Sequence, residues 1–188
     1  MRVTQYLLSL LTIFLCSNSL AITFTPGASN EEKAAQLVLH IEDLYRAQAS
    51  RATMTMKVET PHYARAMSME TISLGREKAF IRILGPKKDK GITTLKQDQE
   101  MWNYFPKINR VIKVPPSMMM GSFMGSDFTN DDLVKQTKLI EEYHLQLQED
   151  DSVYTIVLLP KEQTVTVWGK IEMSIDKNNQ LPISQTYY

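Results

Sequence analysis

The chain has 188 residues, and its 21 basic and 21 acidic residues give a formal net charge of +0. Nucleic-acid-binding proteins usually carry a basic excess, so this balance gives no reason to expect nucleic acid as a partner. A chain of this length can bury one substantial hydrophobic core but is short for two domains.

The first 21 residues have the pattern of a secretory signal peptide. Arg2 precedes an apolar run over residues 7–15, and the small residues Ser19 and Ala21 stand at the spacing that a signal peptidase reads. The run is too short to cross a bilayer as a helix of the mature protein. We therefore expect cleavage after Ala21 and one mature domain over residues 22–188.

Cys16 is the only cysteine of the chain and lies within this leader. A lipid anchor on Cys16 is the alternative to a cleaved leader, but it would require small residues just before the cysteine. Residues 13–15 are Ile, Phe and Leu. We therefore expect a mature chain without a thiol, which excludes disulfides and cysteine catalysis.

A helix is predicted at the start of the mature chain, over residues 29–48. Ser29 and Glu32 form a Ser-x-x-Glu capping box, in which the two residues satisfy free backbone donors of the first turn. Apolar residues then recur at helical spacing and form one apolar stripe: Leu37, Val38, Ile41, Leu44 and Tyr45.

After Ser50, apolar residues recur at every second position instead of at helical spacing, and this pattern indicates successive strands. Gly75 and the segment 85–91 interrupt the pattern as turns, and the second turn contains Pro86. The predicted strands of this first group cover residues 53–58, 65–74, 78–84, 92–96, 100–105 and 110–114.

A second group of strands is predicted in the last third of the chain. Leu139, Tyr143 and Leu145 alternate with polar residues, and the cleanest alternation of the sequence runs from Val165 to Ile175. The predicted strands of this group cover residues 139–147, 153–159, 165–175 and 181–188, with a hairpin turn over residues 176–180.

These elements predict a mainly β protein with helices (α+β), built on a meandering antiparallel sheet. The apolar face of such a sheet must be covered by closure of the sheet or by helices. We expect an open, incomplete β-barrel, or half-barrel, whose concave apolar face is covered by the N-terminal helix and by a short helix after Asp127. A sandwich of two sheets is the main alternative.

The segment SFMGSDFTNDDL, residues 122–133, combines apolar, small and acidic residues directly after three methionines. Asp127 or Thr129 can cap a short helix over residues 130–135, and Asp131 and Asp132 would lie near its positive N-terminal end. Gly125 permits a tight turn before the helix. The apolar residues Phe123, Met124, Phe128 and Leu133 would pin the segment onto an apolar surface.

A calcium site formed by Asp127, Asn130, Asp131 and Asp132 is the alternative, because hard cations bind clustered oxygen ligands. The spacing lacks the alternating ligands, the glycine and the distal glutamate of an EF-hand loop. We therefore expect these acids to act as helix caps, and we expect no metal site.

The sequence offers little for an enzyme. His40, His62 and His144 show no metal-ligand spacing, and no serine lies in a nucleophile elbow. Glu141 and Glu142 are neighbours on a predicted strand, so their side chains would point to opposite faces. We expect no catalytic residue and no cofactor.

Several unusual motifs mark the second half of the chain: MWNYFP (101–106), RVIK (110–113), SFMGSDF (122–128) and VWGK (167–170), with Ile-Asp at 175–176 and Leu-Pro at 181–182. Together they resemble the bacterial outer-membrane lipoprotein-sorting (LolA-like) family, over essentially the whole mature chain. The resemblance implies an open β-barrel with a hydrophobic cavity, in a periplasmic protein that handles lipid-modified cargo. Its relatives continue into further strands after the Leu-Pro motif, so we expect a domain shortened at its C-terminus.

On this basis we expect a periplasmic carrier of lipids or lipoproteins that holds acyl chains in its cavity. Methionine side chains are flexible and polarizable, and they suit apolar ligands of varied shape. The candidate cavity lining is Met54, Met56, Met67, Met69, Trp102, Tyr104, Phe123 and Met124, and the candidate motif loop is Ser122, Gly125, Ser126, Asp127 and Phe128. Core packing is the alternative role for each lining residue.

The expected partners are lipid or lipid-modified protein cargo and, in addition, an inner-membrane export complex. The alternative function is that of a non-enzymatic periplasmic accessory subunit of such a complex, which would use the cavity little or not at all. Transient membrane contact is a further possibility, because a cluster of cations could meet phosphate headgroups. The cations in question are Lys87, Lys88, Lys90, Lys107, Arg110 and Lys113, which could equally serve only to solvate turns.

Overall fold

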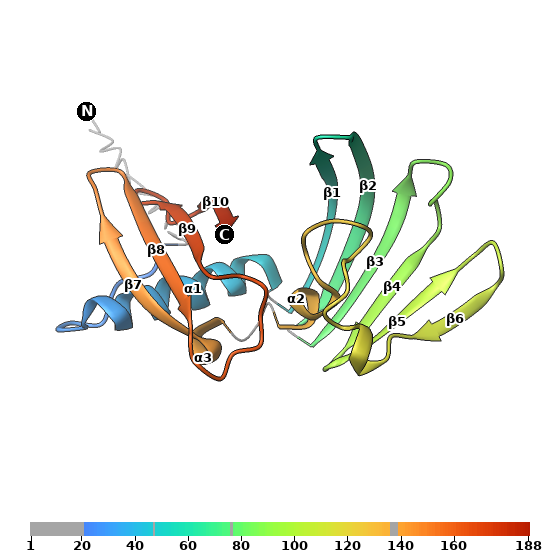
Figure 1. Ribbon diagram of the computed structural model, residues 1–188. Coiled ribbons are helices and arrows are strands. Elements are labelled where there is room, and N and C mark those ends of the chain that lie inside the picture. The colour runs from blue at the N-terminus through green and yellow to red at the C-terminus, as the bar shows by residue number, and fades with distance from the viewer. Residues whose placement is uncertain (1–20, 47, 76, 136–138) are drawn as a thin grey trace, which may run out of the picture.

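The computed structural model describes residues 21–46, 48–75, 77–135 and 139–188 (Figure 1). The predicted signal peptide, apart from Ala21, and Cys16 lie outside the described residues. Among the helices that the structure describes, none is long and apolar enough to cross a membrane.

The predicted N-terminal helix is α1 (Asn30–Arg46), and its capping box is confirmed. The Ser29 backbone N–H donates to Glu32 Oε2 at 2.7 Å, and the Glu32 N–H donates to Ser29 Oγ at 3.2 Å. The hydrogen bond from the Ser29 backbone holds the pKa of the Glu32 carboxyl below its ordinary value. The helix therefore begins where the sequence predicts it.

A six-stranded antiparallel meander follows the helix, in the order β1-β2-β3-β4-β5-β6. The strands lie close to the predicted ranges, because glycine and polar turns separate runs with a period of two. Their bounds are β1 (Ala49–Thr60), β2 (Tyr63–Leu74), β3 (Lys78–Gly85), β4 (Thr93–Gln97), β5 (Glu100–Phe105) and β6 (Arg110–Lys113).

The last part of the chain forms a four-stranded antiparallel sheet in the order β10-β9-β8-β7. Three short helices come before it: η1 (Pro116–Met118), α2 (Asn130–Lys135) and α3 (Leu139–Glu142). The strands are β7 (Tyr143–Glu149), β8 (Val153–Pro160), β9 (Ile171–Asp176) and β10 (Pro182–Tyr187).

The two antiparallel sheets are not closed into a barrel, which confirms the predicted open half-barrel with helices (Figure 1). The prediction of one continuous meander was wrong in one respect, because the strands form two separate hydrogen-bonded sheets. The described residues between β6 and β7, 114–135 and 139–142, form turns and short helices, and β6 does not pair with β7.

Two predicted strands in the second group were too long. Residues 139–142 form the helix α3, and residues 165–169 are irregular although their apolar residues alternate. Val165 and Val167 are 62% and 52% exposed, so this alternation does not mark a buried face. An alternating pattern forms a strand only where a neighbouring strand is available for pairing.

The main core lies between α1 and the four-stranded sheet. Leu37, Val38 and Ile41 of α1 pack with side chains of β7, β8 and β9 in one buried cluster. The strand residues of this cluster alternate along each strand, as a one-sided sheet requires: Tyr143, Leu145, Leu147, Ile156, Leu158, Ile171, Met173 and Ile175.

Candidate functional site

The candidate site centres on residues 119–132, which we call the bridging segment because they contact both sheets. Backbone hydrogen bonds fold the segment onto itself: the Phe123 N–H donates to Phe128 O at 2.6 Å, and the Asn130 N–H donates to Gly121 O at 3.0 Å. Ser122 and Thr129 form an isolated antiparallel bridge. The SFMGSDF motif therefore builds a compact loop that closes directly onto α2.

Thr129 caps α2. The Asp132 backbone N–H donates to Thr129 Oγ1 at 3.1 Å, and the Thr129 N–H donates to Asp132 Oδ2 at 2.7 Å. This reciprocal pair has the geometry of a capping box. Of the two caps that the sequence allowed, Thr129 is the one used, whereas Asp127 is exposed.

The loop packs on the six-stranded sheet through Met124. Met67 and Met69 of β2 and Ile83 of β3 form a small buried cluster, and Met124 packs against it. Arg65 of β2 supports this contact, because its Nη1 donates to Met124 O at 3.3 Å and its Nη2 binds Asp89 Oδ2 at 2.8 Å. The bridging segment thus covers an apolar surface made largely of methionine.

Four of the eight candidate lining residues share one face of the sheet, which we call the methionine face. Met54 pairs with Met69 and Met56 pairs with Met67 across β1 and β2. Residues directly opposite each other on neighbouring strands point to the same face. Met67 and Met69 are buried, Met56 is half-buried and Met54 is exposed.

Trp102 and Tyr104 lie on the opposite face, which we call the tryptophan face. Ile81, on the methionine face, pairs with Thr94, and Thr94 pairs with Asn103. Because side chains alternate along a strand, the two neighbours of Asn103 point the other way. The sheet therefore separates the candidate lining residues into two groups.

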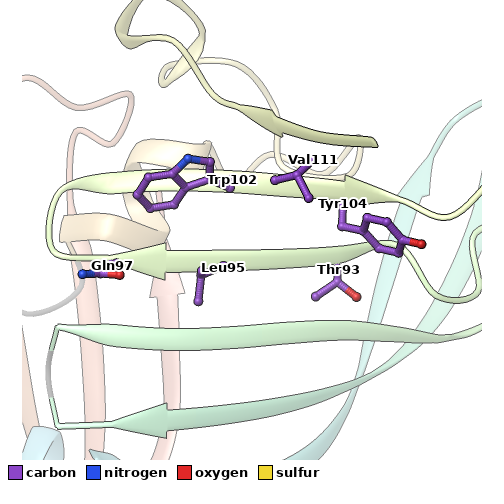
Figure 2. Close-up of a pocket in the computed structure, with 6 residues that line it drawn as sticks. All are labelled: Thr93, Leu95, Gln97, Trp102, Tyr104 and Val111. Atoms are coloured by element: carbon purple, nitrogen blue, oxygen red, sulfur yellow. The ribbon is translucent and has the colours of Figure 1, made fainter. Parts of the chain in front are cut away.

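A shallow groove of about 310 Å³ lies on the tryptophan face (Figure 2). Trp102 and Tyr104 of β5 contribute its aromatic surface, and Lys113 of β6 lies over the Trp102 ring at 5.5 Å. The register extends the apolar surface across the sheet from Ile72 through Phe80 and Leu95 to Trp102. The groove is lined by Thr93, Leu95, Gln97, Trp102, Tyr104 and Val111.

The bridging segment also contacts the four-stranded sheet, through contacts that the sequence reading missed. Trp168 Nε1 donates to Asp132 Oδ1 at 3.0 Å, and the Phe128 ring lies 5.6 Å from the Trp168 ring. Tyr187 of β10 completes the aromatic cluster at 5.0 Å from each of these rings. Burial is the main cause that raises the pKa of the Tyr187 hydroxyl above its ordinary value, which fits its place in this cluster.

The remaining motif residues have local structural contacts. Ser126 is buried, and its hydroxyl donates to Phe123 O at 2.7 Å. Gly125 has φ +75, a backbone conformation that favours glycine, and Met124 before it has φ 52. Phe123 is buried and Ser122 is exposed. The motif therefore fixes the shape of the loop that presents Met124.

The described side chains show no group of three or more His, Cys, Asp and Glu that could hold a metal ion. Of the acids considered for a calcium site, Asp132 binds Thr129 and Trp168, and Asp127 is exposed to solvent.

A family model described as "-like: Uncharacterized protein" matches residues 75–188. No curated protein matches the chain.

Solved structures show the fold. A DUF1329 family protein from Desulfovibrio piger superposes with a TM-score of 0.68 at 22% identity, covering 86% of this chain and 74% of its own. A domain from Vibrio parahaemolyticus, described as an outer membrane lipoprotein-sorting protein, superposes with a TM-score of 0.63 at 21% identity, and the match covers 85% of this chain and 73% of that domain. A LolA superfamily protein from Nitrosomonas europaea superposes with a TM-score of 0.56 at 16% identity, and the match covers 82% of this chain and 71% of that protein. These solved structures show that the fold is that of the LolA-like lipoprotein-sorting proteins. Because the family model covers residues 75–188, more than half of the chain, the chain belongs to that family.

Proposed function

We propose that this protein is a periplasmic carrier of lipids or lipid-modified proteins, and that acyl chains of the cargo bind to the methionine face. The observation that carries the proposal is the cover on this face. Met67 and Met69 are buried against Met124 of the bridging segment, and no described residue of α1 belongs to this cluster. Relatives of the same fold include a domain described as lipoprotein-sorting, which supports the same class of cargo.

The methionine face has the chemistry that an acyl chain requires. Burial of an acyl chain contributes about 0.8 kcal/mol per methylene, so a single chain can bind usefully without a polar anchor. Thioether side chains repack around ligands of different shape at low cost. Met56, Met67 and Met69 together provide such a surface beside Met124.

Binding at this face requires Met124 to move aside. The polar contacts that hold the loop tip to this sheet are weak: Arg65 Nη1 to Met124 O at 3.3 Å and the Tyr63 hydroxyl to Gly125 O at 3.5 Å. In addition, Met124 has positive φ, a conformation that costs a residue with a side chain roughly 1 kcal/mol. We expect Met124 to leave this conformation when the loop opens, which would lower the free energy of opening.

An accessory subunit of a membrane export complex is the second candidate function, and the tryptophan face favours it. Leu95 is 41% exposed and Val111 is 67% exposed beside Trp102, on a face that no described helix covers. Exposed apolar surface of this kind is typical of protein interaction sites. An accessory subunit would use this face and leave the methionine face packed.

Titration of the delipidated protein with a fluorescent lipopeptide separates the two functions. The carrier predicts saturable binding that survives Leu95→Asp on the tryptophan face. Absence of binding, together with copurification of a membrane protein that Leu95→Asp abolishes, would replace the carrier with the accessory subunit.

A further inference from the structure

Three hairpin turns lie at the same end of the six-stranded sheet, the upper end in Figure 1. They are residues 60–63 between β1 and β2, 85–91 between β3 and β4, and 105–110 between β5 and β6. An added Cβ on Gly91 would lie 3.3 Å from Pro106 Cγ, so the second and third turns touch. We call these turns the hairpin end.

Unpaired cations are concentrated at the hairpin end. None of the salt bridges between described residues involves five exposed cations there. Of the described residues in and beside the three turns, only Glu59 and Asp89 are acidic, and Asp89 is bound to Arg65 at 2.8 Å. The five cations are Lys87, Lys88, Lys90, Lys107 and Arg110.

The three turns also expose apolar side chains. Ile108, at the tip of the third turn next to Lys107, is 58% exposed, and Val111 just below it is 67% exposed. Tyr63 of the first turn is 49% exposed. Lysines that serve only to solvate a turn do not require exposed apolar residues beside them. The combination of cations and apolar residues therefore indicates a binding surface.

We propose that the hairpin end docks on a bilayer that contains anionic phospholipids. The cations are spread over two adjoining turns and not gathered in a pocket, and this spacing fits a planar array of phosphates. Each lysine or arginine near an anionic bilayer strengthens attraction to it, and tyrosine is favoured at the interface. Ile108 would enter the headgroup region as an apolar anchor. This docking uses the end of the sheet and does not depend on the proposed cargo.

Cosedimentation with vesicles tests the proposal on the purified mature protein, which we expect to be residues 22–188. Vesicles that contain phosphatidylglycerol are compared with vesicles of phosphatidylcholine alone. The test variant is Lys88→Gln with Lys107→Gln at the hairpin end. The control is Lys33→Gln with Lys78→Gln, which removes two lysines away from this end that form no salt bridge with another described residue.

The proposal predicts binding to the anionic vesicles only. The test variant should bind about 30-fold more weakly at low ionic strength, because two surface cations are lost. The control should bind within about threefold of the wild type, and Ile108→Ser should bind about tenfold more weakly. Salt at about 1 M, where the Debye length falls to about 3 Å, should abolish most of the binding.

Equal binding to neutral vesicles, or equal losses in the test and control variants, would overturn the proposal. Absence of vesicle binding would also overturn it. If polyglutamate then bound at the hairpin end, the surface would belong to an acidic protein partner. If light scattering instead showed a dimer that the test variant breaks, the occupant would be a second copy of the chain.

Discussion

The indole N–H of Trp168 donates to Oδ1 of Asp132 at 3.0 Å, while Oδ2 of the same carboxylate accepts from the Thr129 backbone N–H at 2.7 Å. Asp132 therefore completes the capping box of α2 with Thr129 and at the same time holds the bridging segment to the chain just before β9. Since the same segment presents Met124 to the methionine face, one carboxylate connects the two halves of the molecule.

We expect two substitutions at this connection to destabilise the fold by different amounts. Trp168→Phe keeps an aromatic ring but removes the donor, and it should lower the free energy of unfolding by about 1–2 kcal/mol. Asp132→Ala also removes the capping acceptor, so its cost should be larger, about 2–3 kcal/mol. Urea denaturation of both variants measures the difference, and a neutral Asp132→Ala would show that the connection is not stabilising.

The assignment of the α2 cap gives a second test. Thr129→Ala should lower the free energy of unfolding by about 0.5–2 kcal/mol through loss of the N-cap. Asp127→Ala is the matched control and should stay within about 0.5 kcal/mol of the wild type, because Asp127 is exposed. A normal melting temperature for Asp127→Ala combined with lost cargo binding would instead make Asp127 a functional residue.

A charge on the methionine face should weaken lipid binding. Met56 is half-buried in the methionine cluster, so Met56→Asp would place a carboxylate where we expect an acyl chain. Binding of a fluorescent fatty acid should weaken by at least about tenfold. Thr55→Asp adds the same charge on the other face of β1 and should bind normally. Unchanged affinity in a folded Met56→Asp variant would remove Met56 from the site.

The helix α1 should lose its cap at low pH. Hydrogen bonds from Ser29 lower the pKa of Glu32, so the folded state favours the ionised carboxylate. This contribution is fully present above about pH 4.3, the ordinary value for glutamate, and is lost as the pH falls through the lowered pKa. Thermal unfolding of the wild type and of Glu32→Gln should therefore differ at neutral pH and converge once the pH has fallen below this lowered pKa. A difference in melting temperature that stays constant at all pH values would show that the ionised form of Glu32 does not stabilise the start of α1.

Local signals in the sequence were sufficient for most elements. The Ser29–Glu32 capping box places the start of α1, and the Thr129–Asp132 pair is the same type of signal at α2. The strands of the meander follow from alternation between glycine and polar turns. These features depend on neighbours in the chain, which the sequence displays directly.

Features that depend on distant partners could not be predicted in this way. The alternation over residues 165–169 has no adjacent strand, and the division into two sheets depends on the path of the chain from 114 to 142. Trp102 and Met67 seemed equivalent as apolar lining, but the pairing register places them on opposite faces. The contact between Trp168 and Asp132 joins residues 36 positions apart, and neither residue signals the other.

The central claim is that acyl chains bind under the Met124 loop, and photo-crosslinking tests it most directly. The delipidated protein is incubated with a lipopeptide that carries a diazirine on its acyl chain, irradiated, digested and mapped by mass spectrometry. We predict labels on Met56, Met67, Met69 or Met124. Labels confined to Trp102, Tyr104 and Val111 on the other side of the sheet would contradict the claim.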